Sequence, residues 1–196
     1  MEKLDIEKLR ESLKGKIGRN IEYYEEINST HLYAKKIAQY SENDGKMIIA
    51  EIQNAGIGTK GRNWYTGKGK NIALTIILKP KCEISDLENL TVDIAIAIKN
   101  AIKELYGYDL QIKKPNDLLI DNKKICGILT QINTIGEKIN YLLISFGFNV
   151  NEDEFSDNIK DIATSLKKEY NKDFCREDII IKIIDNLENL INKKRT

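Results

Sequence analysis

The sequence predicts an α+β fold, in which helices pack against a mixed, mostly antiparallel sheet. Apolar residues recur at helical spacing in two long segments, 87–105 and 180–191. Between them, short runs of β-formers follow one another with turn residues rather than helices in between, which is typical of an antiparallel meander. The chain has 196 residues, 41% of them hydrophobic, so we expect a single domain over residues 1–196.

The first half of the chain alternates helical and β patterns. The predicted elements are, in order, an amphipathic helix within residues 1–18, a strand at 20–27, a helix at 30–40, and strands at 47–52 and 71–78. Gly15 and Gly18 end the first helix, because glycine readily adopts the left-handed conformation that follows helices. The polar Asn28-Ser29-Thr30 elbow supplies the N-cap of the second helix.

The second half begins with the longest predicted helix. Ser85-Asp86-Leu87-Glu88 has the pattern of a capping box at its start, and Gly107 ends it. Strands are then predicted at 110–113, 118–120, 124–133 and 141–150. Residues 151–175 are polar without a clear period, and a last helix covers 180–191.

Charge and hydropathy exclude several classes of protein. With 31 Lys+Arg against 30 Asp+Glu, the chain lacks the excess positive charge of a dedicated nucleic-acid binder, so we expect no nucleic-acid partner. No run approaches the roughly 18 to 20 apolar residues that span a membrane, and the N-terminus is charged where a signal peptide is apolar. We therefore expect a cytoplasmic protein with no membrane partner.

Scarce side chains narrow the chemistry further. Cys82, Cys126 and Cys175 are odd in number and far apart, so neither a disulfide framework nor a CxxC-type zinc site fits, and reduced, mostly buried thiols are expected. His31 is the only histidine, which disfavours nucleophilic triads and multi-histidine metal sites, and we expect it on a helix surface. The remaining chemistry would use lysine, arginine, carboxylates, backbone amides and substrate-bound Mg²⁺.

Five of the 12 glycines fall within residues 56–69. Gly56 to Gly61 spells GxGxxG after a predicted strand, but no helix opens there to receive a pyrophosphate. The spacing from Gly61 to Gly67-Lys68 is one residue too long for a Walker A motif. Residues 56–70 therefore read either as a mobile loop that covers an anionic ligand, with Trp64 available to stack on a base, or as a flexible solvated connection.

A second polar cluster, Lys113-Lys114-Pro115-Asn116-Asp117, lies where a predicted strand ends. A carboxylate beside two lysines suits a Mg²⁺-phosphate, although a Pro-Asn-Asp turn with solvated lysines explains the spacing at least as well. Lys124 is an ordinary surface lysine on composition alone. Gly127, in the strand that follows, leaves room for a ligand against the backbone.

Taken in order, five segments over residues 20–151 resemble the biotin protein ligases, whose close relatives, the lipoate ligases, share their fold. These segments are EINST, AGIGTKGRNW, NIALTIILKP, KKPNDLLIDNKKICGIL and FGFNVN. The resemblance implies an α+β fold like that of the class II aminoacyl-tRNA synthetases. It also implies an enzyme that activates biotin with ATP and Mg²⁺ to biotinyl-5′-AMP and transfers the biotin to a lysine of a biotin carboxyl carrier domain of a biotin-dependent carboxylase.

The same resemblance assigns roles to individual residues. Lys124 and Arg62 are the implied catalytic residues, and Asp117 is the implied contact to the Mg²⁺ of ATP. The implied biotin contacts are Ser29, Thr30, Gln53, Gly56 and Gly127. The implied nucleotide contacts are Gly58, Lys60, Gly61, Arg62, Trp64, Asn116, Lys124 and Asn149. Cations at these positions would offset the repulsion between a carboxylate and an α-phosphate.

The chain departs from the family pattern at several positions. Ile57 and Thr59 replace two arginines of the glycine-rich loop, and Lys114 replaces the tryptophan of KWPND. Ser145, Phe146 and Phe148 stand in a usually small GxGxN strand, where two phenyl rings would narrow or reshape the biotin pocket. These changes keep two alternatives open, an adenylate-forming ligase for lipoate or another acid, and a family member without catalysis that acts as a binding module.

Two companion domains of the family have no counterpart in the sequence. The resemblance ends with the last helix, so we expect neither the C-terminal SH3-like barrel nor the N-terminal DNA-binding domain of repressor-type ligases, and no operator binding. Self-association as a homodimer is left open.

Overall fold

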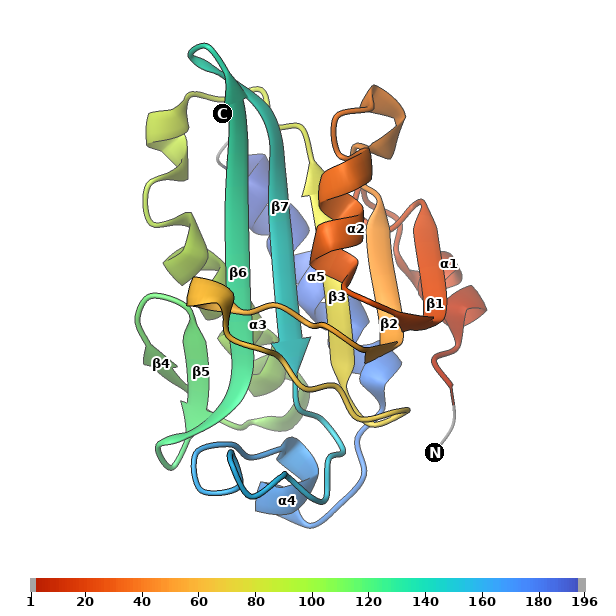
Figure 1. Cartoon of the computed structure of the whole chain (residues 1–196), viewed down its shortest axis with the longest axis vertical. Helices are drawn as coiled ribbons and strands as arrows, with labels where there is room; N and C mark the ends of the chain where they lie inside the picture. The colour runs from red at the N-terminus through yellow and green to blue at the C-terminus, as the bar shows by residue number, and fades with distance from the viewer. Residues whose placement is uncertain (1–2, 194–196) are drawn as a thin grey trace.

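The computed structural model describes residues 3–193, and these residues form one seven-stranded sheet flanked by helices (Figure 1). The strands are β1 (Ile21–Ile27), β2 (Met47–Gln53), β3 (Ile72–Leu78), β4 (Gln111–Lys113), β5 (Asp117–Ile120), β6 (Lys123–Ile135) and β7 (Lys138–Phe148). Their order across the sheet is β1-β2-β3-β7-β6-β5-β4. Only β1 and β2 pair in parallel among these strands, which confirms the predicted mixed, mostly antiparallel α+β fold.

Helices cover the two faces of the sheet unequally. The helices are α1 (Ile6–Ser12), α2 (Thr30–Ile37), α3 (Leu90–Tyr106), α4 (Leu166–Tyr170) and α5 (Arg176–Lys193). The long helices α3 and α5 pack behind the sheet over the main apolar core, whereas the short α2 lies across the front of β2, β3 and β7 (Figure 1). Within residues 3–193, no α-helix covers the front face beside α2, and the segment between β2 and β3 crosses it.

The alternation of side chains along β7 decides which residues meet that open face. Leu142, Ile144, Phe146 and Phe148 belong to the core behind the sheet. The intervening residues face the front, where Tyr141 and Leu143 pack under α2. Both phenyl rings thus belong to the core, but Phe146 also borders the pocket on the front face, so only Phe148 departs from the expectation that the two rings narrow a ligand pocket. Ser145 and Gly147 are the residues of this strand that point forward.

Helix boundaries differ from the sequence prediction at two places. The capping box is formed by Glu83 and Asp86 around a 3₁₀ turn (Ile84–Leu87), not by Ser85 and Glu88. The helix α3 begins only at Leu90, because Asn89 adopts a left-handed φ of 62° that interrupts the turn. The first helix is shorter than the predicted span of 1–18, of which residues 1–2 lie outside the described part. The predicted end of α3 at Gly107 is confirmed.

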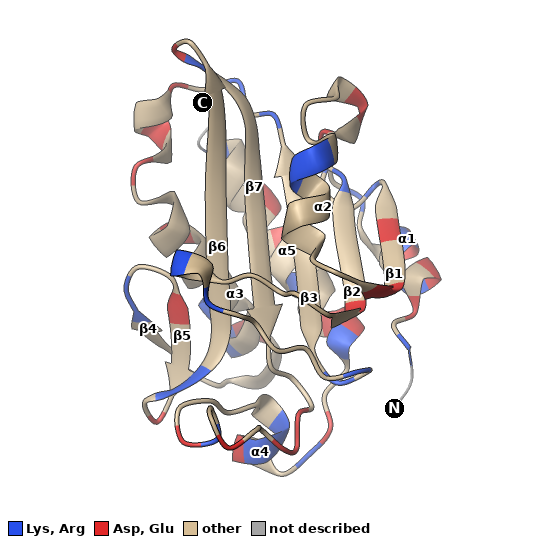
Figure 2. Cartoon of the chain, in the orientation of Figure 1, with Lys and Arg blue, Asp and Glu red and all other residues tan. Residues whose placement is uncertain are grey.

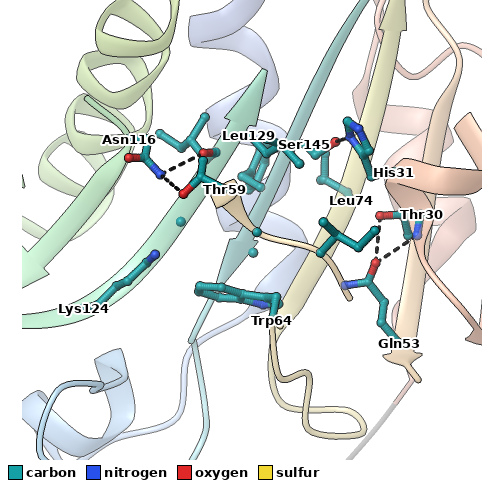
Figure 3. Close-up of a pocket in the computed structure, with 16 residues that line it drawn as sticks. Thr30, His31, Gln53, Thr59, Trp64, Leu74, Asn116, Lys124, Leu129 and Ser145 are labelled. Carbon is teal, nitrogen blue, oxygen red and sulfur yellow. Dashed lines mark hydrogen bonds between the residues drawn. The ribbon is translucent and has the colours of Figure 1, made fainter. Parts of the chain in front are cut away.

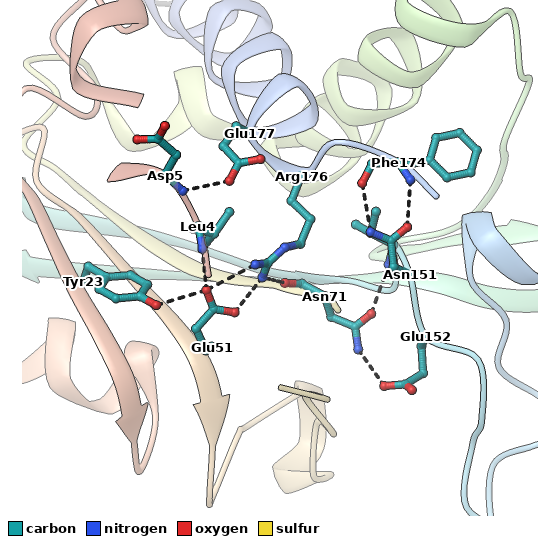
Figure 4. A network of polar contacts seen from close by, with 11 residues as sticks. Leu4, Asp5, Tyr23, Glu51, Asn71, Asn151, Glu152, Phe174, Arg176 and Glu177 are labelled. Carbon is teal, nitrogen blue, oxygen red and sulfur yellow. Dashed lines mark hydrogen bonds and ion pairs between the residues drawn. The ribbon is translucent and has the colours of Figure 1, made fainter. Parts of the chain in front are cut away.

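A buried polar network fastens α5 to the sheet and to the end of the crossing segment (Figure 4). Arg176 donates to Glu51 at 2.6 Å, and both side chains are almost fully buried. Burial alone would raise the pKa of Glu51, but hydrogen bonds from Arg176 and the Leu4 backbone amide outweigh it and hold that pKa below its ordinary value. Asn71 donates to Glu152, which also pairs with Lys70 at 2.9 Å. Lys70 is therefore engaged in anchoring the segment.

Two expectations from composition can be compared with the fold. None of the three cysteines forms a disulfide, but only Cys126 is buried, since Cys82 is half-buried and Cys175 is exposed. None of the helices within residues 3–193 is long and apolar enough to cross a membrane.

Candidate functional site

The open part of the front face holds a small hollow (Figure 3). Its polar end is formed by Thr30 and His31 at the start of α2 and by Gln53 at the end of β2. Asn116 and Lys124 lie at the opposite end, with Trp64 between the two ends in the view of Figure 3. The apolar side chains of Leu129 and Ile57 complete the walls.

The glycine-rich segment that covers this hollow has its own hydrogen-bonded structure. Gly58 N–H donates to the carbonyl of Arg62 at 2.6 Å, and Trp64 N–H donates to the carbonyl of Gly56 at 2.8 Å. A 3₁₀ turn (Thr59–Gly61) forms the tip, where Lys60 and Gly61 both have positive φ. The segment is therefore a small closed hairpin laid over the sheet. Its mobility remains a prediction.

Trp64 lies directly on two glycines that pair across β6 and β7. A Cβ atom on Gly147 would come within 2.1 Å of the indole, and one on Gly127 within 2.9 Å. Only glycine at both positions leaves room for the ring in this place. The indole Nε1 is buried and has no hydrogen-bond partner among residues 3–193.

A second, larger pocket of about 190 Å³ adjoins the first. The two share Gly58, Thr59, Trp64 and Lys124, so these residues form the boundary between them. The second pocket is lined by Arg62 and Asn149 and by apolar side chains from the segment after β7. These apolar residues are Phe155, Ile159, Ile162 and Ala163.

Lys124 is held firmly at this boundary. Its backbone N–H donates to the carbonyl of Ile162 at 2.7 Å, and its own carbonyl accepts from Thr164 N–H at 2.9 Å. Its Nζ forms an ion pair with Asp117 at 2.7 Å and lies 5.3 Å from the centre of the Trp64 ring. A cation is thus fixed at the junction of two pockets. Figure 2 shows further basic residues on the loop tip and at the start of β6.

The described residues do not form a metal centre of their own. They contain no group of three His, Cys, Asp or Glu side chains placed to hold an ion. Asp117 is a single carboxylate beside Lys124, and Asn116 uses its amide nitrogen to contact Ile128 and Thr59. This donor set fits a Mg²⁺ that arrives with a nucleotide, because Mg²⁺ commonly takes one or two carboxylates together with phosphates.

The structure brings most of the sequence-predicted site residues to one of these pockets. Around the first lie Thr30, Gln53, Gly58, Trp64, Asn116, Lys124 and Gly127, and around the second lie Arg62 and Asn149. Asp117 reaches the site through Lys124. Gly56 lies behind Trp64, while Lys60 and Gly61 are exposed at the loop tip.

Ser29 and His31 differ from expectation. The Ser29 hydroxyl caps α2 by accepting from Leu32 N–H, and the residue borders a separate surface hollow rather than the first pocket. His31, expected on a helix surface, is only 6% exposed and hydrogen-bonds to Ser145 and Gln131. Burial lowers the pKa of His31 below its ordinary value. The spacing of an eight-residue helix carries no signal for this contact, because it depends on which strands lie beneath.

Comparisons with known proteins agree with this geometry. The model of the biotin/lipoate A/B protein ligase family matches residues 23–149. The bifunctional ligase/repressor BirA of Bacillus subtilis is 32% identical over 185 residues, which are 93% of this chain and 57% of the relative.

Solved structures of biotin protein ligases have the same fold. The Aquifex aeolicus enzyme, solved in complex with biotin and ATP, superposes with a TM-score of 0.77 at 26% identity, over 89% of this chain and 71% of that one. The Leishmania major enzyme, in complex with biotinyl-5-AMP, gives 0.72 at 25% identity, over 89% and 75%.

The chain spans a little more than half the length of the curated relative, 57% of it. The matched region nevertheless includes the crossing loop, the sheet residues beneath it and Lys124. The chain belongs to the biotin/lipoate A/B protein ligase family.

Proposed function

We propose that this chain activates biotin with MgATP to form biotinyl-5′-AMP and then transfers the biotinyl group to a lysine of a biotin carboxyl carrier domain. The observation that carries the proposal is the position of Lys124 at the boundary of two adjoining pockets. Two relatives support it, since one was solved with biotin and ATP and the other with biotinyl-5-AMP.

The first pocket suits an acid with a polar head and an apolar chain. Thr30 and Gln53 offer hydrogen-bonding groups at one end, and Leu129 lines the way toward Lys124 (Figure 3). Biotin combines a cyclic urea with an aliphatic chain that ends in a carboxylate. With the urea at the Thr30 end, its carboxylate lies near Lys124.

The second pocket suits the nucleotide. Its apolar side chains provide a surface for a base, and Arg62 and the backbone of the loop tip provide donors for phosphates. Asn116 and Asp117 would hold the Mg²⁺ that accompanies ATP. Mg²⁺ supplies charge neutralisation on the phosphates. We also assign Gly58, Lys60 and Asn149 to the binding of the nucleotide.

The reaction requires charge stabilisation rather than a protein nucleophile. A carboxylate oxygen of biotin attacks the α-phosphorus, and the bond to pyrophosphate breaks. Lys124 offsets the negative charge that accumulates between carboxylate and phosphate. In the second step, the acceptor lysine attacks the acyl carbon as a neutral amine, AMP leaves, and the amine proton is lost to solvent. A chain with one histidine can carry out both steps.

The structure weakens the argument for another acid that was based on the two phenylalanines of β7. Phe148 belongs to the core and lines neither pocket, so it does not argue for an altered ligand, whereas Phe146 borders the first pocket. Ile57 lines the first pocket and Thr59 contacts Asn116, which gives both departures from the loop pattern a place in the site.

Intact-mass measurement of a biotin carboxyl carrier domain tests the proposal. After incubation with biotin, MgATP and the wild-type chain, we expect the carrier to gain one biotinyl group. The Lys124→Ala variant should abolish the gain, whereas Lys123→Ala, next to it at the start of β6, should not. An unmodified carrier in the presence of folded wild-type protein, or equal modification by the Lys124→Ala variant, would contradict the proposal.

A further inference from the structure

The polar end of the first pocket is a continuous chain of hydrogen bonds rather than a set of separate groups. Gln53 Oε1 accepts from the Thr30 backbone N–H at 2.9 Å and lies 3.1 Å from the Thr30 hydroxyl. The Thr30 hydroxyl lies 3.0 Å from that of Thr75, which lies 2.9 Å from that of Ser145. Ser145 in turn lies 2.8 Å from Nδ1 of His31 (Figure 3).

One backbone amide fixes the donor and the acceptor of every hydrogen bond in this series. The Thr30 N–H can only donate, so the oxygen of Gln53 must face it. The Thr30 hydroxyl then has to donate to that same oxygen, because an amide oxygen has no proton to give. Thr75 therefore donates to Thr30, and its hydroxyl is left to accept from Ser145.

The hydrogen bond between Ser145 and His31 determines which ring nitrogen of His31 carries a proton. Ser145 has one proton, which it gives to Thr75, so it must accept from His31 and Nδ1 must carry a hydrogen. A neutral imidazole protonated at Nδ1 has an acceptor at Nε2. The side-chain oxygen of Gln131 lies 3.0 Å from Nε2, so this form of the ring requires the Gln131 amide to turn its nitrogen to that atom. The burial of His31, at 6% exposed, favours this neutral form.

Ser145 consequently faces the pocket with a defined polarity. Its proton is committed and one lone pair is occupied by His31, so it can offer a ligand only an acceptor. The amide nitrogen of Gln53 carries two N–H groups. One makes a long 3.4 Å contact to the Thr66 hydroxyl, and the other can donate to a ligand. A cyclic urea presents both complements, N–H donors and a carbonyl acceptor, whereas a dithiolane ring presents neither.

We propose that Ser145 is a specificity-determining residue that accepts a hydrogen bond from an N–H group of the acid's head, with His31 as the residue that positions its hydroxyl. The proposal rests on the proposed function, since it concerns the head group of the acid that the site activates. It assigns a role to Ser145, whose side chain replaces the small residue usual at this position of the family's GxGxN strand.

The single histidine of the chain allows a direct test. In a ¹⁵N-labelled sample without ligand, the ring-nitrogen shifts of His31 should report the proton on Nδ1 at neutral pH. In the Ser145→Ala variant, Nδ1 loses its acceptor, and the proton should move to Nε2, where Gln131 can accept it. A wild-type ring protonated at Nε2 alone would overturn the proposal.

Calorimetric titration with biotin and with lipoate tests the ligand side. The Ser145→Ala and Ser145→Gly variants should bind biotin about tenfold more weakly than the wild type, the effect of one lost hydrogen bond to a buried N–H. Thr91→Val removes a hydroxyl from a similar pair with Thr130 on the other side of the sheet and should leave biotin affinity unchanged. Any lipoate binding should be the same in all four proteins, because lipoate has no head-group N–H.

The outcomes separate this proposal from the proposed function. If the wild type binds biotin and the Ser145 variants bind it equally well, only the specificity role fails. If the wild type does not bind biotin, the proposed function and the specificity role both fail. Weaker binding in both Ser145 variants, with unchanged binding in Thr91→Val, supports both.

Discussion

Replacing Gly147 by alanine should displace Trp64 while leaving the sheet intact. Gly147 sits within β7 without a left-handed φ, so the backbone accepts an alanine there. The new Cβ would lie 2.1 Å from the indole. Carbon atoms pack at about 3.5 Å or more, so the ring has to move by about 1.4 Å. Overpacking of this kind usually costs about 1–3 kcal/mol, which the loop can relieve by lifting off the sheet.

The single tryptophan makes this displacement visible. In the Gly147→Ala variant, Trp64 emission should shift to the red and become more accessible to acrylamide. Biotin activation should fall about 100-fold, because a shift of roughly 1 Å in a positioning group has effects of that size. In a Trp64→Ala background, the same change should cost no further activity or stability, since no ring remains to clash. Unchanged emission and activity in Gly147→Ala would refute the reasoning.

Three further predictions concern stability and ionisation. Phe148→Ala should lower the free energy of unfolding by about 3–5 kcal/mol in urea titrations but leave biotin affinity unchanged, because the ring fills the core behind the sheet; a selective loss of affinity would contradict its placement. Arg176→Met should cost about 3–5 kcal/mol by leaving Glu51 buried without its partner, and combining it with Glu51→Leu should recover much of that loss. The pKa of His31, followed by NMR, should lie below its ordinary value. The folded state then binds the proton less readily than the unfolded state. The contribution of His31 to stability is therefore full above its pKa in the unfolded state and declines as pH falls through its pKa in the folded state. The His31→Gln variant should not show this decline.

The sequence predicts element types well where the periodicity is long. Helices α3 and α5 and strands β1, β2 and β3 are found where the apolar patterns indicate. The start of α3 is misplaced because a capping-box pattern looks the same whether a 3₁₀ turn or an α-helix follows. In this chain, the left-handed conformation of Asn89 separates the 3₁₀ turn from the α-helix, and an asparagine side chain does not require that conformation.

The site is predicted less completely, for two physical reasons. Counting alternate residues along β7 from Gly147, which must face the loop, would have placed Phe146 and Phe148 in the core. The stacking of Trp64 on the glycine pair could not be found in this way, because it depends on the register between β6 and β7. The contact between His31 and Ser145 likewise joins residues 114 positions apart in the chain.

Biotin-dependent exchange of labelled pyrophosphate into ATP tests the central claim most directly, because it needs the acid, the nucleotide and Lys124 but no carrier protein. The wild-type chain should catalyse exchange only when biotin and Mg²⁺ are present, Lys124→Ala should lose it, and Lys123→Ala should retain it. Exchange that proceeds equally without biotin, or that survives in Lys124→Ala, would contradict the assignment of the two pockets to an acid and a nucleotide that meet at Lys124.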